Sequence, residues 1–183
     1  MAGSPARPDD AAGAGEVQVW DPLVRVFHWT LAAAFLGAQL WEDPRALHET
    51  LGWIAAGAVA IRLVWGFVGS PHARFADFIP TPRGFVAYVR DAAAGRERRY
   101  LGHNPAGGAM VAALLATVLG LAATGWMMGL DAFWGVSWVE ELHEGLAQLG
   151  LLLVALHLTG VVWESRRHGE NLVAAMITGR KRR

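Results

Sequence analysis

Four histidines occupy positions from which they could hold metal centres inside a membrane. His143 and His157 lie fourteen residues apart in the last apolar stretch of the chain, and His28 and His48 flank the first connection between apolar stretches. Fourteen residues of helix span about 21 Å and close nearly four turns, so these two imidazoles face one side at two depths. The chain has no cysteine, which leaves histidine as the main candidate metal ligand. The spacing therefore predicts two metal-binding levels along one helix.

The elements that must position these histidines are four apolar segments. Hydrophobic residues make up 54% of the 183-residue chain, and a membrane-spanning helix needs about 20 such residues. The segments run at about 23–41, 48–69, 108–130 and 141–164. We predict an all-α integral membrane four-helix bundle over residues 17–183, with short interfacial helices, preceded by a disordered cytoplasmic leader over residues 1–16.

The charges predict how the bundle is oriented. The formal net charge is zero, which gives no electrostatic reason to expect nucleic acid as a partner. Basic residues gather in the second connection and after the fourth segment, whereas Arg45 is the only basic residue in the first and third connections. By the positive-inside rule, we expect both termini to be cytoplasmic.

This orientation pairs the histidines by depth. His28 then lies on the inner side and His48 on the outer side, while the last segment places His143 outside and His157 inside. Depth therefore pairs His48 with His143 and His28 with His157. Two coaxial imidazole pairs predict two six-coordinate b-type haems stacked across the bilayer, whereas zinc would need its four ligands at one depth. A histidine-lined proton or metal transporter, which would bind no haem, is the alternative from another class.

Three further residues are candidates for cofactor binding on the inner side. Arg62 follows His48 by fourteen residues, so it shares that face at the inner level, where a guanidinium could bind a haem propionate. Arg25, three residues before His28, could do the same or extend to lipid headgroups. His103 could bind a propionate, line a quinone pocket, compete with His28 as a ligand, or be a loop residue at a helix start.

An ordered set of motifs extends this interpretation. The chain contains Val19-Trp20-Asp21-Pro22, Arg25-Val26-Phe27-His28-Trp29, His48-Glu49-Thr50-Leu51-Gly52, Arg62-Leu63-Val64-Trp65-Gly66, Gly102-His103-Asn104-Pro105, His143-Glu144 and His157. From about Trp20 to Arg183 it resembles the bacterial and nickel-hydrogenase-type cytochrome b561 family. The resemblance implies two haem b groups ligated by His28, His48, His143 and His157, in a multi-pass protein of the bacterial inner membrane.

The resemblance also implies a function, which we state as an expectation. The chain would be an electron-transfer subunit between the quinone pool and a redox partner, either a c-type cytochrome or a hydrogenase-like protein. A superoxide:quinone oxidoreductase is the alternative, but the acidic outer connections suit a basic soluble protein better than a small anion. Membrane lipid is a further expected partner, a homodimer is compatible with the sequence, and no catalytic residue is predicted.

Overall fold

The computed structural model describes residues 15–41 and 43–183. Most of the predicted leader, residues 1–14, lies outside the described residues, and Glu16 begins the first strand. The elements follow in the order β1 (Glu16–Gln18), α1 (Pro22–Leu40), α2 (Arg45–Val68), α3 (Phe75–Phe78), α4 (Pro82–Ala93), α5 (Pro105–Met128), the 3₁₀ turn η2 (Asp131–Phe133), α6 (Ser137–His168), α7 (Leu172–Thr178) and β2 (Arg180–Arg182).

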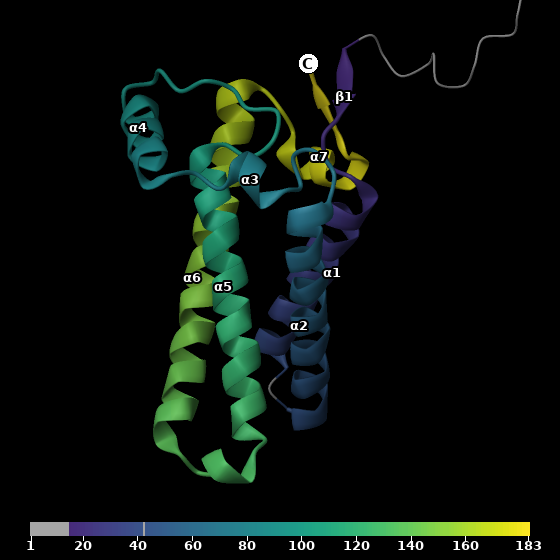
Figure 1. Ribbon diagram of the computed structural model, residues 1–183, viewed down its shortest axis with the longest axis vertical. Helices are drawn as coiled ribbons and strands as arrows, with labels where there is room; N and C mark the ends of the chain where they lie inside the picture. Colours follow the sequence, from purple (N-terminus) through teal and green to yellow (C-terminus); the bar gives the residue numbers. More distant parts are fainter. Residues whose placement is uncertain (1–14, 42) are drawn as a thin grey trace, which may run out of the picture.

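Helices α1, α2, α5 and α6 are each long and apolar enough to cross a membrane. They form two antiparallel hairpins, α1 with α2 and α5 with α6, which are joined mainly where α2 packs on α5 (Figure 1). The predicted all-α membrane bundle is confirmed. We call the end with β1, α3, α4, α7 and β2 the cap end, and the end with the α1–α2 and α5–α6 connections the loop end.

Local signals explain where three of the helices begin. Asp21, Thr81 and Asn104 are the N-caps of α1, α4 and α5, and each is followed by a proline in the first turn. Their side chains accept hydrogen bonds from the backbone N–H groups of Val24, Gly84 and Gly107, at 2.9, 3.1 and 2.7 Å. Helix α5 therefore starts three residues before the apolar segment that we predicted, because the cap and the proline determine the start.

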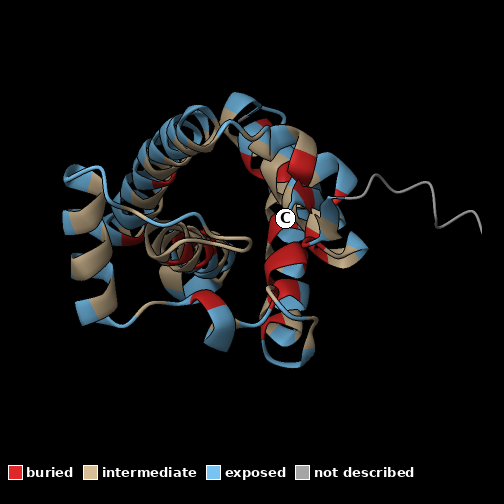
Figure 2. Cartoon of the chain, turned by 90° about the horizontal axis from the view of Figure 1, so that it is seen from above, coloured by how far each residue is buried: buried red, intermediate tan, exposed pale blue. Residues whose placement is uncertain are grey.

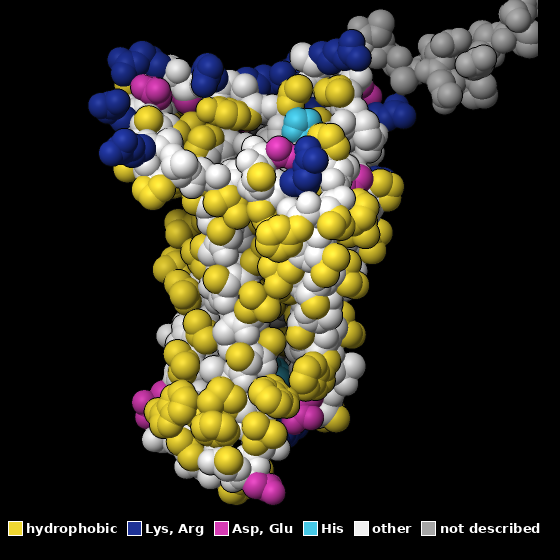
Figure 3. Space-filling model, in the orientation of Figure 1, with side chains coloured by type: hydrophobic (Ala, Val, Ile, Leu, Met, Phe, Trp, Pro, Cys, Tyr) yellow, Lys and Arg dark blue, Asp and Glu magenta, His cyan; other side chains and the backbone are white. Residues whose placement is uncertain are grey.

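The hydrophobic core is small and lies at the junction of the hairpins. Its buried members come from α1, α2 and α5 and are Ala34, Phe35, Ala55, Val59, Leu115 and Val118. Viewed along the bundle, exposed residues cover the outward sides of the long helices (Figure 2). The surface of the shaft is largely hydrophobic, while Lys and Arg side chains gather at the cap end (Figure 3), as expected of a protein whose outer surface meets lipid.

Residues 16–18 and 180–182 form a sheet at the cap end that the sequence did not predict. Strand β1 pairs antiparallel with β2, and Glu16 lies opposite Arg182. Lys181 is buried and donates to the carbonyl oxygens of Tyr100 and Leu101, at 3.2 and 3.0 Å. Its ammonium also forms an ion pair with Glu170 at 3.4 Å. This tail therefore holds the loop that carries His103.

Candidate metal centres

The four histidines come together as two pairs, at two levels of the bundle. Near the loop end, His48 of α2 faces His143 of α6, with ring centroids 6.2 Å apart. Towards the cap end, His28 of α1 faces His157 of α6, with ring centroids 6.3 Å apart. Helix α6 thus supplies one imidazole to each level, and the other hairpin supplies the partner.

These separations fit a single metal ion between the two rings of each pair. A metal–nitrogen bond of about 2.0 Å, added to about 1.1 Å from nitrogen to ring centre, would put the centres of two imidazoles that bind one metal from opposite sides about 6.2 Å apart. Within residues 15–41 and 43–183, no three His, Cys, Asp or Glu side chains converge to hold a metal ion. Each level therefore offers two imidazoles as donors, which would suit a metal whose remaining ligands come from a macrocycle.

Hydrogen bonds orient both rings of the loop-end pair. His48 Nδ1 lies 3.0 Å from the carbonyl oxygen of Ala38, which can only accept, so Nδ1 carries the proton. His143 Nδ1 lies 2.8 Å from the hydroxyl oxygen of Thr124. That hydroxyl donates to the carbonyl of Gly120 at 2.9 Å, so its oxygen is left to accept from His143. Each ring therefore keeps its Nε2 lone pair for a metal.

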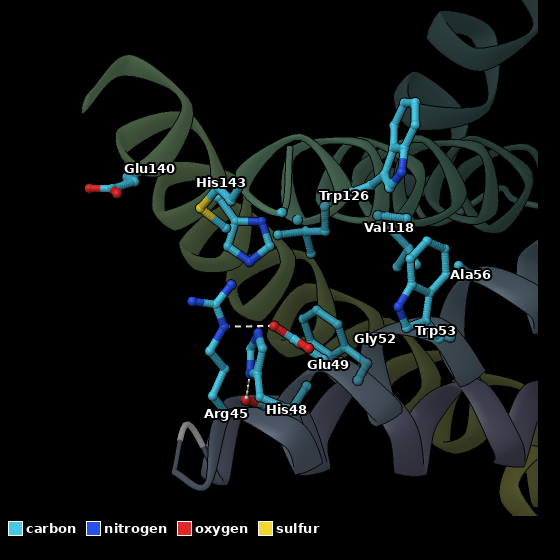
Figure 4. Close-up of a pocket in the computed structure, with 18 of the residues that line it drawn as sticks. Arg45, His48, Glu49, Gly52, Trp53, Ala56, Val118, Trp126, Glu140 and His143 are labelled. Carbon is cyan, nitrogen blue, oxygen red and sulfur yellow. Dashed lines mark hydrogen bonds and ion pairs between the residues drawn. The ribbon is translucent and has the colours of Figure 1, made fainter. Parts of the chain in front are cut away.

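A cavity of about 580 Å³ surrounds the loop-end pair. His48 and His143 approach it from opposite sides, and Trp53 and Trp126 line it (Figure 4). Gly52 also lines it, one turn after His48, and a Cβ atom there would meet nothing within 4 Å. Its volume lies in the range of about 300–1,000 Å³ that is usual for ligand pockets. The cavity, its aromatic walls and its two imidazoles fit a flat, mostly apolar cofactor such as haem.

The surroundings of the cap-end pair hold buried nitrogen atoms without hydrogen-bond partners. Within the described part of the chain these include His28 Nδ1, Arg62 Nη1 and His103 Nδ1. Arg62 is 2% exposed, donates through Nη2 to the carbonyl of Ala73 at 2.8 Å, and lies over the ring of Phe75 at 4.8 Å. Because buried donors normally have partners, these free nitrogens fit an acidic group brought by a cofactor.

His103 is held in an aromatic environment beside this pair. Its ring centroid lies 4.7 Å from that of Trp20 and 4.6 Å from that of Phe78. Burial lowers the pKa of His103 to about 3, and the charge of Arg62 adds to the effect. His103 is therefore neutral at physiological pH, with one nitrogen available to accept and the other to donate.

Arg25 occupies a different place from the other candidates. Its Nη1 donates to the carbonyl oxygen of Ile177 in α7, so the side chain ties α1 to the C-terminal part of the cap. Its buried Nε has no partner among the described residues. The contact with α7 was not foreseen, because it joins residues that are 152 positions apart in the chain.

Three residues that matter to the site were not singled out from the sequence. Thr124 orients His143. Asp21 caps α1 and also accepts from Trp65 Nε1 at 2.9 Å and from the hydroxyl of Ser70, so it joins the cap end of α1 to that of α2. Burial opposes ionisation of Asp21, but these hydrogen bonds outweigh it and lower its pKa. The signal was present in Trp20-Asp21-Pro22, whose Trp20 packs on His103.

Gly150 is the third such residue, and it lies midway between the two levels. It follows His143 by seven residues and precedes His157 by seven. A Cβ atom at Gly150 would lie only 2.7 Å from Cζ of Phe35, so the phenyl ring of α1 rests on the backbone of α6. Phe35 also lines the loop-end cavity.

Four membrane-crossing helices with two imidazole pairs at separate levels define a membrane cytochrome of the b type. A family model described as prokaryotic cytochrome b561 matches residues 19–179. The chain belongs to the prokaryotic cytochrome b561 family, whose members carry b-type haem and transfer electrons in the membrane.

Curated relatives support this assignment over most of their length. A probable Ni/Fe-hydrogenase B-type cytochrome subunit of Rhizobium leguminosarum bv. viciae is 23% identical, over 90% of this chain and 88% of the relative. Proteins with the same description from Azotobacter vinelandii and Azotobacter chroococcum mcd 1 are 23% and 25% identical, each over 89% of this chain and 87% of the relative. No solved structure matches the chain.

Proposed function

We propose that this chain is a transmembrane dihaem cytochrome that carries electrons between the quinone pool and a redox partner protein. His48 and His143 would be the axial ligands of one haem b, and His28 and His157 those of the other. The observation that carries the proposal is the pair of ring separations, 6.2 and 6.3 Å, at two levels of one bundle. Bound haem supplies reversible one-electron chemistry, and the protein supplies position, burial and hydrogen bonds.

The chain's own residues would perform separate tasks at the two levels. Near the loop end, Ala38 and Thr124 hold the Nδ1 protons of the ligand histidines, which fixes both rings and makes them more basic ligands. Near the cap end, the buried Nη1 of Arg62, which has no hydrogen-bond partner among the described residues, would donate to a propionate. Neutral His103 offers a hydrogen bond to a propionate or to a quinone in the same region.

The buried positive charge also supports a direction of electron flow. Arg62 lies beside the cap-end level, and a nearby positive charge stabilises the reduced state of a cofactor. The hydrogen bonds that raise ligand basicity at the loop-end level favour its oxidised state. We therefore propose that electrons enter at the loop end and move to the cap end.

Orientation and partners follow from the surface charges and the relatives. The cap end carries most of the Lys and Arg side chains, which supports cytoplasmic termini in a bacterial inner membrane (Figure 3). The electron donor would then dock on the other side, at the loop end. The relatives are described as hydrogenase cytochrome subunits, so we propose a hydrogenase-like protein or a c-type cytochrome as this partner.

A feature of the loop-end cavity favours an electron carrier over a superoxide:quinone oxidoreductase. Arg45 lines the cavity, but its guanidinium Nε lies 2.6 Å from a carboxylate oxygen of Glu49. Glu140 also lines the cavity. These carboxylates leave a small anion such as superoxide little net attraction, whereas they would attract a basic protein surface.

The first test is spectroscopic. Protein purified in detergent should give a low-spin b-type spectrum on reduction, with two haems per chain. The H157A variant should lose the cap-end haem and H143A the loop-end haem. The control is H72N, which alters a loop histidine with a φ of 71°, a conformation that asparagine tolerates.

A second set of variants guards against simple misfolding. The H143M variant should keep the loop-end haem but raise its midpoint potential, because ligation by one histidine and one methionine raises haem potentials. A haem-to-protein ratio near zero in the wild-type protein would refute the proposal and favour a transporter. Unchanged haem content and potentials in every histidine variant would refute the ligand assignment.

A further inference from the structure

Helix α4 has an apolar face that the other described residues leave uncovered. Phe85, Val86 and Val89 lie within about 100° of one another on the helix, and Val86 and Val89 are 65% and 45% exposed. The opposite side carries Asp91, which pairs with Arg96 at 3.5 Å. Such separation of apolar and charged faces is typical of a helix that lies in a membrane interface.

Two arginines stand at the border between these faces. Arg83 and Arg90 are seven residues apart, so they lie above one another on the same edge of the helix. Both are exposed, and neither forms an ion pair with a carboxylate within residues 15–41 and 43–183. From that edge, each side chain can bury its methylene groups in lipid and place its guanidinium at the level of the headgroup phosphates.

The place of α4 in the fold brings this surface to the bilayer. The helix stands to one side of α5 and α6 at the cap end (Figure 1), and hydrophobic side chains lie along the lower edge of this region, towards the shaft (Figure 3). Tyr88 fixes its position by donating to Glu164 of α6 at 2.7 Å. Hydrophobic side chains in this region thus adjoin the largely hydrophobic surface of the shaft.

We propose that α4 is a binding surface for anionic phospholipid, with Val86 and Val89 in the acyl region and Arg83 and Arg90 on the headgroup phosphates. A basic residue near an anionic surface contributes about 1 kcal/mol, which is about a fivefold preference for each arginine and roughly 30-fold for both. The proposal is independent of haem and of the electron-transfer function.

The absence of cysteine from the chain makes a direct test possible. A single cysteine at Val86, labelled with the fluorophore NBD, is placed in the full-length protein in lipid nanodiscs. Quenching is then compared between nitroxide-labelled phosphatidylglycerol and nitroxide-labelled phosphatidylcholine. The label at Val86 should be quenched strongly, with phosphatidylglycerol preferred several-fold or more. The same label at Ala87, a half-buried residue on the side of the helix away from the apolar face, should be quenched weakly.

The role of the two arginines is tested by placing the label at Val86 in two variants, R83Q/R90Q and the control R96Q. In R83Q/R90Q, quenching at Val86 should persist while the preference for phosphatidylglycerol disappears. In R96Q, which removes an arginine that is already paired with Asp91, the preference should remain. A label at Val86 that stays unquenched by either lipid would overturn the proposal and indicate a protein partner on this face. Equal quenching by both lipids in the unsubstituted background would overturn the choice of anionic lipid.

Discussion

The hydrogen bond between Thr124 and His143 provides the sharpest test of the loop-end centre. In the T124V variant, valine replaces the hydroxyl with a methyl group of similar size, so it removes the acceptor 2.8 Å from His143 Nδ1 without opening a cavity. A buried N–H group that loses its partner costs about 1–3 kcal/mol. Loss of such a partner to a metal-binding histidine weakens metal affinity by about 10–100-fold.

Thr117 gives a closely matched control. It lies two turns earlier on α5 and is also buried, and its hydroxyl donates to the carbonyl of Ala113 at 2.9 Å. Among the described residues, that hydroxyl has no hydrogen bond to a histidine. T117V therefore removes a buried threonine hydroxyl but keeps the hydrogen bond between Thr124 and His143.

The assay is the rate at which each variant yields haem to a haem-scavenging protein, followed in the Soret band. T124V should release one of its two haems about 10–100-fold faster than T117V, and the midpoint potential of that haem should rise because its ligand becomes less basic. Equal release rates and equal potentials in T124V and T117V would refute the role of Thr124 and the assignment of His143 as an oriented ligand.

Three further predictions concern the cap and the contact between the levels. K181M removes a buried ammonium that donates to the carbonyls of Tyr100 and Leu101, while Arg99 still pairs with Glu170, so it should destabilise the protein by about 1–3 kcal/mol in thermal unfolding. R180Q, at an exposed residue, should cost at most about 1 kcal/mol. Burial opposes ionisation of Glu170, but Arg99 and Lys181 outweigh it and lower its pKa from the ordinary value of 4.5. The ionised carboxylate therefore stabilises the fold above pH 4.5, and this stabilisation is lost as the pH falls through the pKa of Glu170 in the folded protein. Limited proteolysis of the tail should accordingly increase on acidification, and E170Q should remove this dependence. G150A places a Cβ atom against Phe35 and should lower the free energy of unfolding by about 1–3 kcal/mol. Adding F35L should restore most of this stability. If the effects of G150A and F35L on the free energy of unfolding simply add in the double variant, the contact between the two residues is contradicted.

The membrane makes much of this fold predictable from sequence. A helix that crosses the hydrocarbon core must be apolar over about 20 residues, which locates the four helices in the sequence. The uneven distribution of arginine indicates which end of each helix is cytoplasmic. The depth of each histidine in the membrane could therefore be compared without knowing any contact between helices. In the structure His28 lies beside His157 and His48 beside His143, which are the pairs expected from their depths. The caps Asp21, Thr81 and Asn104 were similarly accessible, because an N-cap acts within one turn of its own sequence.

What could not be predicted depends on contacts between distant parts of the chain. The β1–β2 sheet has three residues in each strand, too few for a periodic pattern to show. Thr124 lies in an apolar segment where a threonine ordinarily bonds back to its own helix, and nothing local reveals that its oxygen also meets His143. Lys181 appeared to be one cation in a basic tail, and only the folded cap shows that it is buried.

The way in which α6 is held has a consequence for the assembly of the protein. Over its 32 residues, α6 buries only Val139 and Gly150, and it packs chiefly on its hairpin partner α5. Its links to the other hairpin include the two histidine pairs and the Phe35 contact. Because α2 packs on α5, we expect the two hairpins to associate without cofactor. Helix α6 should become fixed against α1 and α2 only when cofactor bridges its two histidines to their partners, so cofactor binding would complete the assembly of the bundle.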